Sequence, residues 1–236
     1  MSEPTIYKPS IYNGNGVYKN GASGGGGGGG IVPDEYEELE YLEINRNNGG
    51  ANFIATLNTF SNADKDFSII VEFDGVNEDY QKNLIKFSAQ AWSSSPGFSI
   101  DYVNRTDNTR TIYSRNNGGD YYTPIYTTND YTNKVKFSIK NNNFDITYSD
   151  GRKTVLTTNY ASSNFSNMFL FTDRTNPGEY YQFWGKFYEM EVNGVLKLVP
   201  VKRKLDGVIG LFDLVSQVFI TANYGQSNII AGPVKL

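Results

Sequence analysis

The chain has 236 residues, of which 15% are aromatic, and its formal net charge is −4. It contains neither Cys nor His, which excludes disulfides, thiolate or imidazole metal sites, a Cys nucleophile and a Ser-His-Asp triad. Scattered basic residues in an acidic chain argue against nucleic-acid binding, and no apolar run approaches the ~20 residues that span a bilayer.

The N-terminus has neither the basic region nor the apolar region of a signal peptide. The sequence therefore predicts a protein assembled in a cytoplasm, which either stays there or leaves as part of a larger particle.

Residues 1–23 contain a short near-repeat of a β-branched residue, a Tyr, a polar residue and a turn-former. The apolar members of the three units are Ile6, Tyr7, Ile11, Tyr12, Val17 and Tyr18. Repeats of this size cannot bury their own faces and need a partner surface. We therefore expect an anchoring arm that docks on another subunit, with a disordered polar tail as the alternative.

Residues 24–30 are an uninterrupted run of seven glycines. No Gly-Lys-Ser/Thr motif and no strand–turn–helix context surround the run, so a phosphate-binding loop is not expected. A flexible chain of this length has a root-mean-square reach of roughly 15 Å. The run is interpreted as a linker between the arm and a domain over residues 31–236.

The domain opens with Pro33 and Asp34, which could cap a brief helical turn; an edge strand is the alternative. In either case Tyr36, Leu39 and Leu42 are expected on the inner side.

Alternating apolar residues predict a series of short strands further along the chain. They are expected over residues 51–60, 67–73, 84–87, 98–102, 136–140 and 144–148, with a wholly apolar strand over 168–171. Residues 141–143 predict a hairpin turn. Many short strands with frequent turns predict an all-β sandwich or jelly roll.

The last strands have the clearest pattern. One face of an extended segment is expected to carry Trp184, Tyr188, Met190 and Val192. Asn193 and Gly194 then predict a tight turn with two positive-φ residues, and Asp206 with Gly207 predicts a second turn.

A family resemblance rests on the run FWGKFYEMEVNGVLKLVPVKRKLDGVIGLFDLVSQVFITANYG, which is followed by IIAGP. It resembles the C-terminal end of concanavalin A-like (laminin-G-like) domains of phage and prophage surface proteins. The segment YEELEYLE at residues 36–43 is similar to the opening of the same family, so the resemblance brackets residues 31–236. It implies a concanavalin A-like jelly-roll β-sandwich preceded by an extended arm.

The resemblance also implies a function. A bacteriophage virion component is expected, a head fibre or capsid-decoration protein that docks on capsid or tail proteins through its arm. Such proteins are normally symmetric homo-oligomers, here a trimer rather than a dimer. The displayed domain would bind host or environmental glycans. A tail-fibre receptor-binding protein and a free-standing lectin remain alternatives.

Residues 103–133 are predicted to be loops, with arginines, amides and tyrosines close together. Sugars present hydroxyl edges to polar groups and C–H faces to aromatic rings. A glycan site is therefore expected to draw on Trp92, Tyr113, Arg115, Asp120, Tyr121 and Tyr122. The alternative is that these aromatic residues cover the ends of the sandwich or face a neighbouring subunit.

Two pairs of acids, Glu72 with Asp74 and Glu189 with Glu191, stand at alternate positions, as in concanavalin A-like glycoside hydrolases. Neither pair extends to a third acid. Acids on the solvent side of a strand explain both pairs, so no enzyme is expected and hydrolysis is a distant third hypothesis.

Calcium is implied for some laminin-G-like domains. The candidate turn residues are Asp101, Asp107, Asp130 and Asp206. No calcium-loop pattern surrounds them, so turn formation is the preferred explanation and no cofactor is expected. The basic residues at 202–204 lie beside Asp206 and predict a solvated hairpin rather than an anion site.

Overall fold

The computed structural model describes most of the domain and a short piece of the arm. The described residues are 17–19, 31–45, 50–61, 66–73, 81–88, 97–104, 110–115, 123–127, 134–140, 143–157, 164–171 and 183–236. Within them, none of the helical structure has the length and hydrophobicity needed to cross a membrane.

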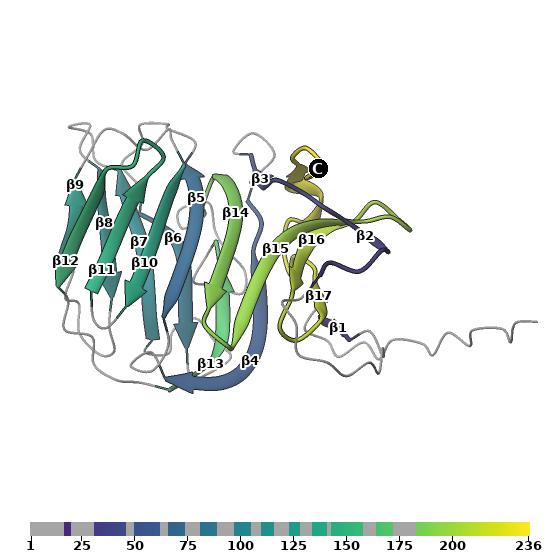
Figure 1. Cartoon of the computed structure of the whole chain (residues 1–236), viewed down its shortest axis with the longest axis horizontal. Coiled ribbons are helices and arrows are strands. Elements are labelled where there is room, and N and C mark those ends of the chain that lie inside the picture. Colours follow the sequence, from purple (N-terminus) through teal and green to yellow (C-terminus); the bar gives the residue numbers. More distant parts are fainter. Residues whose placement is uncertain are drawn as a thin grey trace, which may run out of the picture.

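The described strands form two antiparallel sheets packed face to face (Figure 1). The path of the larger sheet consists of β1 (Val17–Lys19), β17 (Val218–Ile220), β16 (Ile209–Asp213), β15 (Leu196–Arg203), β14 (Gly185–Val192), β5 (Phe67–Phe73), β10 (Val135–Lys140), β11 (Asn143–Tyr148) and β12 (Lys153–Thr157). Beside this path lie β2 (Tyr36–Glu38), β3 (Leu42–Ile44) and β18 (Ile229–Ala231).

The smaller sheet has six strands. In order across the sheet they are β4 (Phe53–Ser61), β13 (Asn164–Leu170), β6 (Gln81–Ser88), β7 (Gly97–Asn104), β8 (Arg110–Arg115) and β9 (Thr123–Thr127). A short 3-10 helix, η3 (Gln226–Asn228), precedes β18. The prediction of an all-β sandwich is confirmed.

The main core fills the space between the two sheets. On β5 the predicted alternation is confirmed, since Phe67, Ile69, Val71 and Phe73 are buried while the residues between them are only partly covered. Residues 168–171 are completely buried, as predicted for a strand covered on both faces.

A second apolar cluster lies on the opposite face of the larger sheet. It consists of Tyr36, Val199, Val201, Phe212 and Phe219, all buried. The Tyr36 ring lies 5.1 Å from the Phe212 ring and 5.1 Å from the Phe219 ring, centroid to centroid. Strands β15, β16 and β17 therefore bury both of their faces.

The opening of the domain forms an edge strand rather than a helical turn. After a turn in which the Tyr36 N–H donates to the Pro33 carbonyl (3.0 Å), β2 pairs with the end of β15. Tyr36, Leu39 and Leu42 are buried, as predicted.

The predicted apolar face of residues 184–192 is wrong at one position. The register between β14 and β5 shifts between Phe187 and Glu189, which marks a β-bulge. A bulge inserts one residue and reverses the alternation beyond it. Consequently Phe187 joins Met190 and Val192 in the main core, and Tyr188 is displaced from the face that was predicted for it.

The two predicted turns are present, with one correction. The loop after β14 has three residues, closed by the Val195 N–H donating to the Val192 carbonyl at 2.9 Å. Only Gly194 has positive φ (70°) there, so the expected pair of positive-φ residues is wrong. The second turn has Gly207 at φ 73° and connects β15 to β16.

The loop predicted over residues 103–133 is also partly wrong. Strands β8 and β9 fall within it, and β8 pairs with β7 on one side and β9 on the other. Residues with strand propensity, such as Thr111, Ile112 and Tyr113, lie among the polar ones and account for the pairing.

Candidate functional site

The predicted glycan site is described only in part. Tyr113 and Arg115 lie on β8, where their register partners on β7 are Asp101 and Ser99. Trp92, Asp120, Tyr121 and Tyr122 lie outside the described residues, as do Ile6, Tyr7, Ile11 and Tyr12 of the arm. This set therefore stays a prediction.

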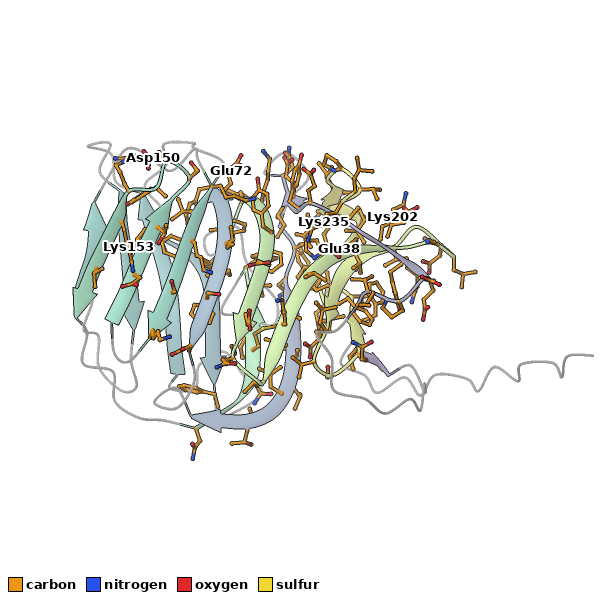
Figure 2. All side chains as sticks on the ribbon, viewed as in Figure 1. Glu38, Glu72, Asp150, Lys153, Lys202 and Lys235 are labelled. Carbon is orange, nitrogen blue, oxygen red and sulfur yellow. The ribbon has the colours of Figure 1, made fainter. Side chains whose placement is uncertain are left out.

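A different group of polar and aromatic side chains lies on the outer face of the larger sheet. We call it the outer-face patch; it consists of Tyr41, Glu72, Lys134, Lys186 and Tyr188. In the sheet, Lys186 on β14 has Glu43 of β3 as its register partner on one side and Glu72 of β5 on the other. The bulge in β14 brings Tyr188 to the same carboxylate (Figure 2 labels Glu72).

The Glu72 carboxylate connects two strands of the patch. Its Oε1 lies 2.7 Å from the Lys186 ammonium, and its Oε2 accepts a hydrogen bond of 2.9 Å from the Tyr188 hydroxyl. The Glu72 contact raises the pKa of Lys186, and burial, followed by the bond to Glu72, raises the pKa of Tyr188. The ammonium is therefore charged and the phenol protonated at neutral pH.

The aromatic part of the patch consists of two tyrosines in contact. The rings of Tyr41 and Tyr188 are 5.6 Å apart at an interplanar angle of 60°, which is an edge-to-face arrangement. The Lys134 ammonium lies 3.7 Å from the centroid of the Tyr188 ring, and Lys186 lies 5.1 Å from that of Tyr41.

The Lys134 ammonium and the Tyr41 hydroxyl differ from the other polar groups of the patch. Among the described residues, no carboxylate pairs with Lys134 and no hydrogen bond engages the Tyr41 hydroxyl. Glu72 and Lys186, by contrast, are 23% and 30% exposed and satisfy each other. The patch thus offers a cation, a hydroxyl and two aromatic rings on the outer face of the sheet.

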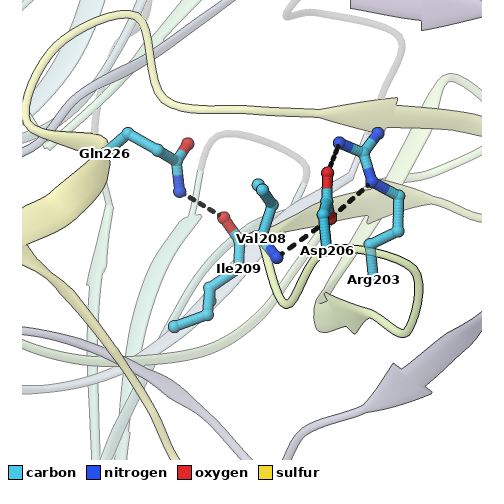
Figure 3. Close-up of polar contacts among 5 residues, drawn as sticks. All are labelled: Arg203, Asp206, Val208, Ile209 and Gln226. Atoms are coloured by element: carbon cyan, nitrogen blue, oxygen red, sulfur yellow. Dashed lines mark hydrogen bonds and ion pairs between the residues drawn. The ribbon is translucent and has the colours of Figure 1, made fainter.

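An open hollow of about 490 Å³ lies beside the β15–β16 turn, and Figure 3 shows polar contacts of residues around it. Its lining residues are Asp206, Gly207, Val208, Ile209, Gly225, Gln226 and Ser227. The Gln226 side chain donates to the Ile209 carbonyl at 2.7 Å and accepts from the Ala222 N–H at 2.9 Å.

The Asp206 side chain, which also lines this hollow, is likewise hydrogen-bonded to neighbouring residues. Its carboxylate accepts hydrogen bonds from the Arg203 guanidinium at 3.0 Å and from the Val208 N–H at 3.2 Å. The Arg203 contact lowers the pKa of Asp206. These polar groups hold the turn together, which confirms the predicted hairpin and makes the hollow a weaker candidate site than the outer-face patch.

Two of the four acids considered for hydrolysis form ion pairs within the larger sheet. Glu72 belongs to the patch, and Glu191 lies 3.8 Å from the Lys197 ammonium. Asp74 is outside the described residues. Within the ranges that the structure describes, no three acidic side chains come together as a metal site would require.

The sequence matches no protein-family model and no curated protein. Among solved structures, a native heptameric SAP-like pentraxin from Limulus polyphemus is 7% identical and covers 66% of this chain and 76% of its own, with a TM-score of 0.46. Domains LG4-5 of the mouse laminin α1 chain are 7% identical over 84% of this chain and 47% of theirs (TM-score 0.41). The CBM40 module of a Ruminococcus gnavus IT-sialidase, bound to α2,3 sialyllactose, is 14% identical over 69% and 88% (TM-score 0.36). These similarities are too distant to assign a function.

Proposed function

We propose that this chain is a surface component of a bacteriophage virion, a head fibre or capsid-decoration protein whose β-sandwich binds glycans. The layout supports the proposal: an arm of short Ile/Val-Tyr units, seven glycines and one β-sandwich. The resemblance of residues 183–233 to phage surface proteins supports the same assignment. The arm would dock on capsid or tail proteins.

The observation that carries glycan binding is the outer-face patch. A sugar hydroxyl can bond to the Tyr41 hydroxyl, and a sugar C–H face can lie against an aromatic ring. The Lys134 ammonium lies over the Tyr188 ring without a carboxylate partner among the described residues. A positive charge at this position favours glycans that carry a carboxylate.

A titration with matched variants tests this site. The full chain is screened on a panel of neutral and carboxylate-bearing oligosaccharides, and each binder is then titrated by calorimetry. Lys134→Ala should weaken binding of acidic glycans by about tenfold, since loss of a charge-assisted contact costs about 1.4 kcal/mol. Lys136→Ala removes the same charge two residues along the chain and should leave the affinity unchanged. Equal losses in both variants, or no binder in the panel, would overturn the assignment.

Attachment to a virion is tested separately. Phage propagated with a gene that lacks the codons for residues 1–23 should yield particles without this protein, while the variant still binds the same glycans. Particles that retain the truncated protein would contradict an anchoring arm and would favour a free-standing lectin or a tail-fibre protein attached by another surface.

A further inference from the structure

Strand β17 would be the outermost strand of the larger sheet if β1 were not paired with it. An outermost strand has a row of backbone N–H and C=O groups without partners, and proteins must cover or protect such an edge. All three residues of β17 are apolar and buried: Val218 is 7% exposed, Phe219 1% and Ile220 3%. The edge strand is therefore apolar and contains no charged side chain.

β1 covers this edge in an antiparallel register. Val17 pairs with Ile220, Tyr18 with Phe219 and Lys19 with Val218. The third unit of the arm is thus a strand-addition segment, a mode of recognition in which main-chain hydrogen bonds provide much of the affinity. Three paired residues supply only a few such bonds, each worth about 0.5–1.5 kcal/mol.

The connection from β1 to the domain permits docking on another molecule. Residues 20–30 separate β1 from Ile31 and include the seven glycines. Eleven residues can extend over roughly 36–40 Å, and glycines resist ordering because they lose the most conformational entropy. The connection is therefore long and flexible enough for β1 to dock on the same chain or on a neighbouring one.

We propose that the β17 edge is the acceptor site for the N-terminal strand of a second copy of this chain, so that exchange of arms builds a homo-oligomer. Exchange replaces each pairing by an identical one and costs little in contacts. Each chain has one β17 edge but three similar units, which lie at residues 6–8, 11–13 and 17–19. Any of the three similar units of a neighbouring arm could therefore pair with the same β17 edge. In an oligomer several such pairings form together, which raises the overall affinity through effective concentration.

The inference concerns the arm alone and does not depend on glycan binding or on a phage origin. It is tested on the purified full chain, without glycan or virion, so its failure is distinguishable from failure of the proposed function.

The absence of native Cys makes disulfide trapping specific. Lys19 and Val218 are register partners. A chain carrying Lys19→Cys is mixed with a chain carrying Val218→Cys and a size tag, refolded together and oxidised. Exchange predicts a heterodimer of the two chains on a non-reducing gel. Pairing Val17→Cys with the same tagged chain, two residues out of register, should give several-fold less product.

The doubly substituted chain, with Lys19→Cys and Val218→Cys together, separates docking within one chain from docking between chains. A cross-link that forms only within this monomer, with no heterodimer in the mixture, would overturn the proposal. Absence of any cross-link, in the mixture or in the double variant, would overturn it as well, because β1 would then not use this edge. A normal unfolding transition of each variant confirms that it is folded.

Discussion

The strands near the two ends of the larger sheet are very different. At one end, β12 has Val155 54% exposed and Lys153 paired with Asp145 of β11 at 2.6 Å. Near the other end, β17 lies next to the outermost strand β1; it has no charged residue, and its three side chains are buried on both faces. Strand β10, near the β12 end, buries only every second residue, as expected where one face is open to water.

This difference shows how one edge of a sheet can remain exposed to water while the other is covered by an added strand. Charged and exposed side chains protect an edge against further pairing, so β12 needs no cover. An edge enclosed between two apolar clusters has no such protection and gains from an added strand. Substitutions near the two ends are therefore expected to differ widely in their effects on stability and association.

The largest effect is expected from Phe219→Ala at the β17 end. Phe219 is 1% exposed and packs on Tyr36, and truncation leaves a cavity in the second cluster. The free energy of unfolding should fall by about 3–5 kcal/mol in a urea titration. Val155→Ala on β12 should change it by less than about 0.5 kcal/mol. If both substitutions lowered the free energy of unfolding equally, the two ends would not differ in burial.

A second large effect is expected from Gly210→Ala on β16. An added Cβ would lie 2.6 Å from the Ile220 carbonyl oxygen and 2.6 Å from the Phe219 ring. Because one of these atoms belongs to the backbone, β17 must shift, at a cost of about 1–3 kcal/mol. Hydrogen exchange should accelerate at β16 and β17 and stay unchanged at β10–β12. Uniform acceleration over the whole sheet would mean that the ends are not independent.

The same contrast shows what could be predicted from sequence. The alternation of β5 and the apolar run of β13 reveal buried strands, because burial on one or both faces sets the residue pattern directly. Strands β8 and β9 resemble loops in composition. They lie near the edge of the smaller sheet, where strands need fewer apolar residues, and were therefore missed.

The outer-face patch was missed for a different reason. Glu72 and Tyr188 are separated by 116 residues, and they meet only because β5 pairs with β14 and a bulge shifts the register at Phe187. No local pattern encodes a bulge, since it depends on how the neighbouring strands align. The sequence around position 188 is rich in aromatic and charged residues, but a strict period of two placed Tyr188 on the same face as Met190 and Val192.

A smaller effect is expected from Lys153→Ala, which removes the charge that protects β12. Lys153 is 51% exposed and Asp145 21%, so the loss in unfolding free energy should stay within about 1 kcal/mol. Self-association is the sharper measurement. Light scattering should show a larger mean mass than for the native chain at equal concentration. Lys136→Ala, inside the sheet, changes the net charge equally and should not associate. If the two variants have the same mean mass, the Lys153 charge does not protect this edge against association.

The smallest effect is expected from Asp206→Asn near the β17 end. The Arg203 contact lowers the pKa of Asp206 below its ordinary value of 3.8, so the ion pair stabilises the fold above about pH 4 and this contribution disappears as the pH falls through the lowered pKa. At pH 7 the variant should lose at most about 0.5 kcal/mol, because the pair is exposed and Asn still accepts the Val208 hydrogen bond.

Urea titrations of the native chain and of Asp206→Asn should therefore converge in strong acid. The Arg203 guanidinium also lies 5.0 Å from the Phe219 ring, and the variant leaves this contact in place. If the difference between the two chains instead persists in acid, Asp206 acts through the geometry of the turn rather than through charge. The β17 end would then depend on the shape of the β15–β16 hairpin as well as on buried apolar side chains.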